Sequence, residues 1–183
     1  NLPDFGKFDS HRDADSAALE NLQAVEITAL TVDTYGFVKG DLNQIQLAQD
    51  PTNSTPYDNL SQVWYTVIPM DAGAARLVAE ITATTAVDLD LYWGFDFNGD
   101  GLPSADEEYG NSATATAYEY LSEWGFPVGF YDVWILVQNW QGSGAPLDDI
   151  TLSIGNVPYE PADPATMPVL GPETNPAGEP FTL

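Results

Sequence analysis

Hydrophobic and polar residues alternate in short runs along most of the chain. The clearest run extends from Val87 to Phe95, where every second residue is apolar and Asp88 and Asp90 fall between the apolar positions. Because the side chains of a strand point alternately to its two faces, this run predicts a strand with one apolar face and one face that carries carboxylates. Weaker runs of the same period lie at residues 24–32, 37–47, 63–68, 75–82 and 149–154.

Residues 130–137, with the sequence FYDVWILV, form the most continuous apolar run in the chain. A strand of this kind has to be covered on both faces, so we expect it near the centre of a sheet. The alternation of small residues in NSATATA, at 111–117, predicts close packing of alanines against a bulky neighbour.

About eight short strands with turn residues between them, and no long amphipathic helix, predict an all-β fold. We expect a jelly-roll-type β-sandwich over residues 23–155. Residues 1–22 are polar and acidic, and we expect an N-terminal arm there, with a possible helical turn at 16–23. Residues 156–183 are expected to form an extended Pro-rich C-terminal tail.

The tail is set apart by its prolines, which recur every three or four residues and disfavour both a helix and a central strand. It is either a linker to a following domain or an extended segment that lies on a surface, its own or a neighbour's. Prolines stand at positions 158, 161, 164, 168, 172, 176 and 180, and apolar anchors are Val157, Tyr159, Met167, Val169, Leu170, Phe181 and Leu183.

The segment after the Val87–Phe95 strand matches the calcium-loop pattern D-x-[DN]-x-[DN]-G-x5-E. In that pattern the first, third and fifth positions provide side-chain oxygens, the seventh a main-chain carbonyl, the ninth a further oxygen and the twelfth a bidentate carboxylate, while a glycine makes the sharp turn. The predicted Ca2+ ligands are therefore Asp96, Asn98, Asp100, Leu102, Ser104 and Glu107, with Gly101 at the turn.

The alternative for this loop is an ordinary surface turn rich in Asn, Asp and Gly. Several constrained positions are filled in register, and Asp106 and Glu108 add further carboxylates that repel one another without a cation. The flanks predict a strand and an irregular loop rather than two helices. We therefore expect a structural clamp and not a calcium sensor.

The charge is strongly negative, with 28 acidic residues against 4 basic ones and a formal net charge of −24. Such a chain repels nucleic acid and anionic lipid, so we expect no nucleic-acid partner and no membrane insertion. Cysteine is absent, and no apolar run is long enough to span a bilayer. From the acidic composition and a first residue, Asn1, that is not methionine, we expect a processed, secreted chain at the cell surface or outside the cell; an excised fragment of a longer chain would look the same.

Sequence motifs for catalysis are missing. The pattern HExxH, the pattern GxSxG, a phosphate-binding glycine loop and a cysteine nucleophile do not occur, and His11 is the one histidine. We therefore predict that the chain is not an enzyme, although paired carboxylates for glycoside hydrolysis stay open among so many acids. The five tryptophans could form a carbohydrate platform or belong to the core, and Trp124 is the one we expect to be exposed.

Residues 50 to 157 resemble the bacterial pre-peptidase C-terminal domain of secreted subtilisin-like proteases. The resemblance lies in DPTNSTPYDNL, TVIPMDAGAARLVAEI, DLDLYWGFDFNGDGLPSADEE, YDVWILVQNWQGSG and DDITLSIGNVP. It implies a small, non-catalytic β-sandwich that often carries Ca2+, with ligand roles for Asp96, Asn98, Asp100 and Glu107 and additional acids at Asp88 and Asp90. The chain departs from many relatives in having Tyr109 and Tyr120 where they carry a cysteine pair.

Two functions follow as hypotheses. In the first, the chain is a calcium-stabilised extracellular structural protein that associates with itself, through the C-terminal tail or the N-terminal arm, into a filament or surface layer. In the second, it is an accessory C-terminal binding module of a secreted subtilisin-like protease, which attaches the enzyme to substrate or to the cell surface.

Overall fold

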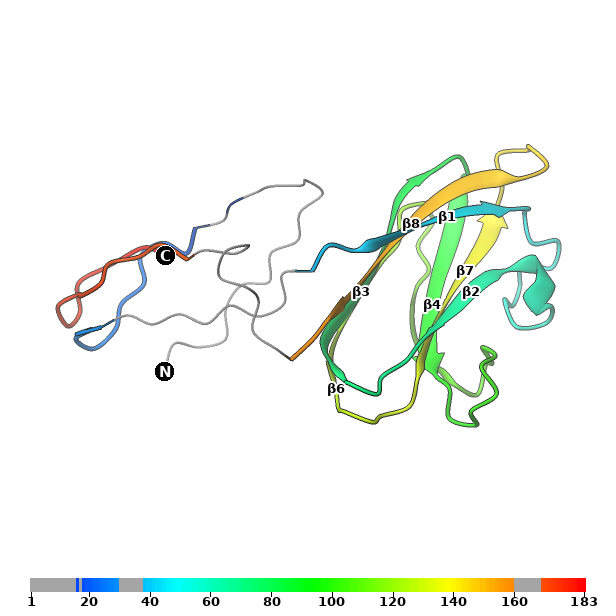
Figure 1. Ribbon diagram of the computed structural model, residues 1–183. Helices are drawn as coiled ribbons and strands as arrows, with labels where there is room; N and C mark the ends of the chain where they lie inside the picture. The colour runs from blue at the N-terminus through cyan, green and yellow to red at the C-terminus, as the bar shows by residue number, and fades with distance from the viewer. Residues whose placement is uncertain (1–15, 17, 30–37, 160–168) are drawn as a thin grey trace. The chain divides into compact units, whose positions relative to one another are not determined.

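The computed structural model describes residues 16, 18–29, 38–159 and 169–183. The chain divides into two compact units, one of residues Tyr35–Glu160 and one that combines the two ends of the chain, Asn1–Thr34 and Pro161–Leu183. The larger unit holds all the named strands (Figure 1). Each unit is described by itself.

Eight antiparallel strands and one short 3-10 helix make up the larger unit. They are β1 (Asp41–Leu47), η1 (Leu60–Gln62), β2 (Trp64–Ile68), β3 (Ala74–Thr84), β4 (Asp88–Phe95), β5 (Glu108–Ser112), β6 (Tyr120–Phe126), β7 (Val133–Gln141) and β8 (Asp148–Val157). One sheet has the order β1-β8-β3-β6 and the other the order β2-β7-β4-β5. Two four-stranded sheets in this order form a jelly roll, which confirms the predicted fold class.

The core lies between the two sheets and is built from every second residue of the central strands. Leu89, Leu91 and Trp93 of β4 face this core and are at most 3 % exposed. The same layer contains Leu77, Ala79 and Ile81 of β3, Val133, Ile135 and Val137 of β7, and Ile150 and Leu152 of β8. The apolar residues that alternate in the sequence of these strands are therefore the ones that face the core.

Strand β7 is buried on both faces, as its continuous apolar sequence predicts. Its outward residues Trp134 and Leu136 are fully buried and pack with Val63 in a second, smaller cluster. Tyr57 and Leu60, from the segment between β1 and β2, are among the residues that cover this cluster. The long β1–β2 connection thus serves as a lid over the outer face of the central strand.

One predicted strand, at residues 24–32, was wrong over its described residues 24–29, while residues 30–32 lie outside the described residues; two real strands were not predicted. Residues 24–29 make no strand of the sandwich, and Val25 is 83 % exposed. The close packing of alanines predicted at 111–117 holds only for Ala117, since Ala113 and Ala115 are exposed. The missed strands, β5 and β6, are edge strands. β5 and β6 bury few side chains in alternation, so their sequences carry little of the strand pattern.

The end of β8 also differs from the prediction. The sandwich was expected to end at residue 155, but β8 continues through Val157, whose main chain is in register with Arg76 of β3. Val157 is thus part of a sheet and not an anchor of the tail.

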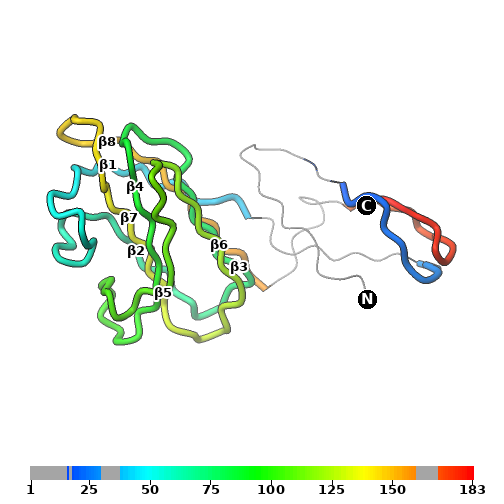
Figure 2. Tube along the Cα trace, turned by 180° about the vertical axis from the view of Figure 1, so that it is seen from behind, coloured from blue at the N-terminus to red at the C-terminus, as the bar shows by residue number. Residues whose placement is uncertain are grey.

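The second unit pairs the two ends of the chain with each other. Leu22 and Phe181 exchange main-chain hydrogen bonds in both directions, at 2.9 Å each, and Leu19 and Leu183 do the same at 2.9 and 3.1 Å. Ile27 and Asn175 form the third such pair, at 2.8 and 2.9 Å. The arm and the tail accordingly run side by side (Figures 1 and 2). The helical turn predicted at residues 16–23 does not form over the described residues 18–23.

None of the helices among the described residues has the length and apolar character needed to cross a membrane. His11, which the sequence placed in the arm, and Met167, an expected anchor of the tail, lie outside the described residues.

Candidate metal centre

The predicted calcium loop connects β4 to β5 at one end of the sandwich (Figure 2). Its two ends are held together by the main chain, because the Phe95 N–H donates to the Glu107 carbonyl at 3.2 Å. The Asp96 N–H donates to the Asp132 carbonyl at 2.9 Å, which ties the start of the loop to the segment before β7. The loop is therefore a closed structure with fixed ends.

Gly94 allows this closure. A Cβ at this position would overlap both the Glu107 carbonyl and the ring of the fully buried Trp134. The glycine thus brings the main chain of Glu107 against β4 and also makes room for the central tryptophan. The sequence showed Gly94 only as a residue of the outer face of the strand, so this role was missed.

Asp96 organises the first half of the loop. Its carboxylate is 7 % exposed and accepts two main-chain hydrogen bonds, from the Asp100 N–H to Oδ1 at 3.0 Å and from the Gly101 N–H to Oδ2 at 2.9 Å. Each carboxylate oxygen can accept about two hydrogen bonds or ligand bonds. Asp96 therefore fixes the loop and keeps acceptor capacity on both oxygens.

The side chains of Asn98 and Asp100 also accept main-chain N–H groups, each from the residue two positions later. The Asn98 Oδ1 atom accepts the Asp100 N–H at 2.8 Å, and the Asp100 Oδ1 atom accepts the Leu102 N–H at 2.8 Å. Gly101 has φ +72° with no atom near its missing Cβ, so the backbone angle and not the space requires glycine there. The predicted sharp turn at Gly101 is confirmed.

Glu107 closes the loop from its other end. Its side chain is 4 % exposed, its Oε1 atom accepts the Asn98 N–H at 3.3 Å, and its Oε2 atom accepts the Ser104 hydroxyl at 2.9 Å. The Glu107 carboxylate is therefore turned back onto the first half of the loop. Glu107, eleven positions after Asp96 in sequence, thus joins the first half of the loop through Asn98.

The structure brings Asp96, Asn98, Asp100, Ser104 and Glu107 into one hydrogen-bonded network. Leu102 joins it through its N–H, while its side chain is 44 % exposed. Among the described residues, no three His, Cys, Asp or Glu side chains converge closely enough to hold a metal ion by themselves. A calcium loop does not depend on such a cluster, because amide, hydroxyl and main-chain oxygens supply part of the coordination. The donor set consists entirely of hard oxygens and fits Ca2+.

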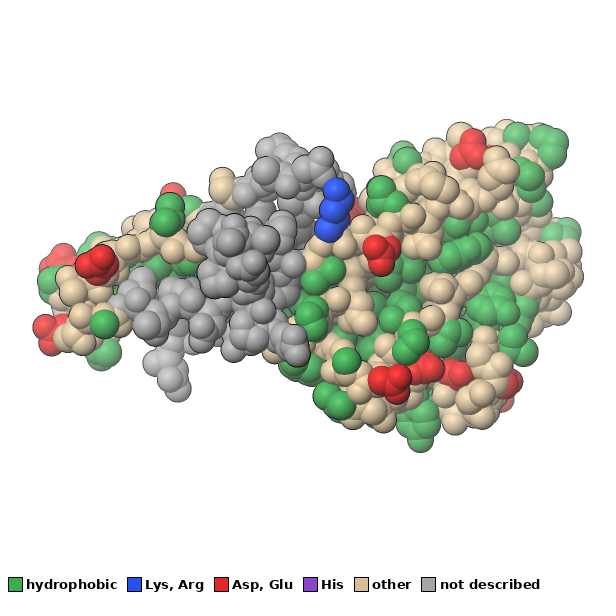
Figure 3. Space-filling view, in the orientation of Figure 1, with side chains coloured by type: hydrophobic (Ala, Val, Ile, Leu, Met, Phe, Trp, Pro, Cys, Tyr) green, Lys and Arg blue, Asp and Glu red, His purple; other side chains and the backbone are tan. Residues whose placement is uncertain are grey.

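Carboxylates are plentiful at this end of the sandwich (Figure 3). The nearest described arginine in sequence, Arg76, is used elsewhere: its Nε donates to the Ser122 hydroxyl at 2.9 Å and its guanidinium lies 5.2 Å from the centre of the Trp124 ring.

Asp88 and Asp90, the additional acids that the family resemblance implies, are not part of this loop. They lie at the opposite end of β4 from Asp96, and Asp90 is about 20 Å away at the usual rise of a strand. Together with Glu119, which sequence reasoning missed, they form a separate buried group. These two aspartates cannot bind the same ion as the loop.

Burial dominates the electrostatics of this second group. It raises the pKa of Asp90 to about 6; a hydrogen bond from the Tyr92 hydroxyl opposes the shift, and Asp88 and Glu119 add to it. Burial also raises the pKa of Asp88, with a further contribution from Glu119, and the Asp88 Oδ1 atom has no hydrogen-bond partner. Glu119 accepts hydrogen bonds from Ser112 and Thr114, so it is satisfied within its own loop.

The tryptophans divide between the core and the surface. Trp93 and Trp134 are buried, whereas Trp124 is 61 % and Trp140 39 % exposed, which confirms the expectation for Trp124. Trp64 is half-buried against the core. The tryptophans therefore do not form one platform.

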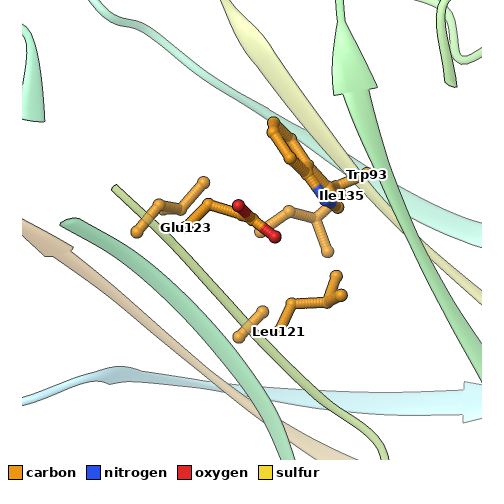
Figure 4. Close-up of a pocket in the computed structure, with 6 residues that line it drawn as sticks. Trp93, Leu121, Glu123 and Ile135 are labelled. Carbon is orange, nitrogen blue, oxygen red and sulfur yellow. The ribbon is translucent and has the colours of Figure 1, made fainter. Parts of the chain in front are cut away.

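A small pocket lies between the sheets, and the Glu123 carboxylate points into it beside Trp93, Leu121 and Ile135 (Figure 4). Leu77 and Ala79 complete its walls. It has room for roughly one water molecule. This pocket is too small for an organic substrate.

No protein-family model matches the chain, and no curated protein matches it either. The resemblance to the pre-peptidase C-terminal domain, with the ligand roles it implies, stays a prediction.

Proposed function

We propose that the chain is a non-catalytic, calcium-stabilised extracellular protein that associates with itself into a filament or surface layer through its terminal segments. The observation that carries this proposal is the pairing of residues 19–27 with residues 175–183. Segments that can form a main-chain ladder are suited to strand addition between copies. The sandwich supplies a rigid body to which these segments are attached.

Calcium has a structural role in this proposal. Asp96, Asn98, Asp100, Ser104 and Glu107, with the carbonyl of Leu102, would hold the ion at the junction of β4 and β5. The bound ion would neutralise the buried carboxylates of Asp96 and Glu107 and so stabilise the sandwich. Outside the cell, where calcium is abundant, such a site supports a chain that has no cysteine for disulfides.

The net charge of −24 supports an extracellular partner that is not a nucleic acid or an anionic membrane. It also means that copies of the chain repel one another at low ionic strength. Self-association is therefore expected to need dissolved cations.

Negative-stain electron microscopy of the purified chain, with and without millimolar Ca2+, tests this function. We expect fibres or sheets in Ca2+. Monodisperse particles of single-chain size at every protein and Ca2+ concentration would contradict it.

The alternative is an accessory binding module of a secreted subtilisin-like protease. It is favoured by a cluster of exposed aromatic rings around the loop, in which Phe97, Tyr109, Phe130 and Tyr131 are 38–68 % exposed. Phe97 and Tyr131 have ring centroids 4.9 Å apart, and Phe130 and Tyr131 5.3 Å apart. Tyr109 contacts the ring of Phe95, at 5.1 Å. Exposed rings of this kind provide a contact surface for a polymer. Co-sedimentation with insoluble protein or polysaccharide, without fibres, would favour this alternative.

A further inference from the structure

The ladder between the two chain ends uses groups that every copy of the protein presents in the same way. Its hydrogen bonds join main-chain atoms of the pairs Leu19–Leu183, Leu22–Phe181 and Ile27–Asn175, together with the Gly178 N–H and the Ala24 carbonyl at 3.0 Å. The arm of one copy could make all of these bonds with the tail of another. Nothing in their chemistry requires that both strands come from one chain.

The pairing has a defined register. Between the Leu22–Phe181 pair and the Leu19–Leu183 pair, the arm has one residue more than the tail, and Asn21 takes up this difference with φ +56°. On the tail side, the Asn175 Nδ2 atom donates to the Glu179 carbonyl at 2.8 Å and holds a turn within the strand. Such irregularities fix a register that a flat, regular ribbon would leave free to slip.

Among its described residues, the ribbon buries few side chains. Phe181 is 7 % exposed, while Leu19 and Leu22 are only half-buried and most neighbouring residues are exposed. Two-stranded ribbons are marginally stable in water. The ladder can therefore open and re-form without unfolding the sandwich, whose core is separate.

We propose that the ladder is exchanged between copies, so that residues 19–27 of one copy pair with residues 175–183 of a second copy in the register seen within the chain. This inference rests on the function proposed above and names the interface that would carry it. Each copy has one arm and one tail, so exchange proceeds head to tail and gives an open chain of copies unless it closes into a ring.

Protein concentration and salt set the balance between the closed and exchanged forms. The bonds are the same in both forms, so exchange competes with the local concentration of a chain's own other end, which is about millimolar for short tethers. Every ionisable side chain of residues 18–29 and 169–183 is a glutamate: Glu20, Glu26, Glu173 and Glu179. Screening by salt or Ca2+ should therefore favour the ladder between copies.

The absence of cysteine allows a direct test with single-cysteine variants. Leu19→Cys and Leu183→Cys are each unable to form a disulfide within one chain. Residues that exchange both main-chain bonds have Cα atoms about 5.5 Å apart, within the range that a disulfide spans. The two variants are mixed at concentrations from micromolar to millimolar in Ca2+ and oxidised, and the disulfide between residues 19 and 183 is measured by peptide mass spectrometry.

We expect this mixed disulfide to exceed, several-fold, the one formed by the control pair Val25→Cys and Leu170→Cys, whose side chains are more than 75 % exposed and outside the paired positions. We also expect it to increase with concentration. Equal yields for both pairs would overturn the exchange.

A double variant, Leu19→Cys with Leu183→Cys, distinguishes failure of the exchange from failure of the proposed function. Oxidised in dilute solution, it should close within each chain and lose the ability to assemble, and reduction should restore assembly. Fibres that persist in the closed form would overturn the exchange and the role of the terminal segments, but would leave the proposed calcium-stabilised assembly standing. If the wild-type chain forms no assembly and the mixed disulfide stays at control level, both proposals fail.

Discussion

The sandwich and the terminal ribbon are held together by different interactions. In the sandwich, buried side chains from two sheets fill a common core, and the main-chain ladders only set the geometry. In the ribbon the main-chain hydrogen bonds are present, but Phe181 is the one buried hydrophobic residue among those described. Since burial of apolar surface is the dominant stabilising term, we expect the sandwich to be much more stable than the ribbon.

The largest expected effect lies in the sandwich core. Leu91 is fully buried on β4, and Leu91→Ala should lower the free energy of unfolding by about 3 kcal/mol because it removes apolar contacts and leaves a cavity. Leu42→Ala, on a residue of β1 that is 61 % exposed, should change it by less than about 0.5 kcal/mol. Urea unfolding followed by tryptophan fluorescence measures both, and similar losses would show that the two positions are not core and surface.

Calcium removal should have the next largest effect on the sandwich. At a Ca2+ concentration a hundred times the Kd, binding adds about 2.7 kcal/mol to the free energy of unfolding, and EDTA should abolish this gain. Glu107→Gln should remove most of the Ca2+-dependent increase in Tm. Asp106→Asn is the matched control, since it removes the same charge from the exposed neighbouring residue and should retain the increase. A melting curve that is the same in Ca2+ and EDTA at low salt would contradict the calcium site.

A smaller effect should depend on pH. The pKa of Asp90 is about 6 in the folded protein, above its ordinary value of 3.8, so the folded state binds this proton more tightly and loses stability as the pH rises through 6. Asp90→Asn should therefore raise the free energy of unfolding by about 1 kcal/mol at pH 7.5 and have little effect below pH 4. Asp58→Asn, at an exposed position, is the control. The same gain at both pH values would rule out ionisation as its cause.

The smallest effect on the sandwich should come from the ribbon. Phe181→Ala removes the single buried anchor of the ladder but no contact within the sandwich core, so the free energy of unfolding of the sandwich should change by less than about 0.5 kcal/mol. Val169→Ala, also in the tail, provides the comparison. Thermal unfolding monitored by near-UV circular dichroism gives the value, and a loss as large as that of Leu91→Ala would mean that the two units are not independent.

The central strands could be predicted from the sequence because they contribute alternating residues to one core. β4 and β7 are examples, and β7 could be recognised as buried on both faces from its continuous apolar run. The edge strand β5 could not, because its sequence EYGNS has no alternation of buried apolar residues. For residues 24–29 the strand prediction was wrong for the opposite reason: Val25 and Ile27 alternate with polar residues, but the partner of Ile27 is Asn175 of the tail and not a strand of the sandwich.

The hydrogen-bonded turn of the candidate site could be predicted because the calcium-loop pattern is local, while its Ca2+ ligand roles stay a prediction. Asp96, Gly101 and Glu107 interact with residues a few positions away in sequence, so spacing alone specifies the turn. The separation of Asp88 and Asp90 from the loop follows from the length of β4. The proximity of Glu119 depends on the path of the β5–β6 connection, which no local pattern encodes.

Sedimentation velocity of the wild-type chain and of Phe181→Ala, each from micromolar to millimolar protein in millimolar Ca2+, tests most directly whether the chain ends join copies while the sandwich stays intact. We predict that the wild-type chain grows in mass with concentration, and that Phe181→Ala remains a single chain at every concentration with the Tm of its sandwich unchanged. Growth of both proteins to the same mass, or of neither, would contradict this.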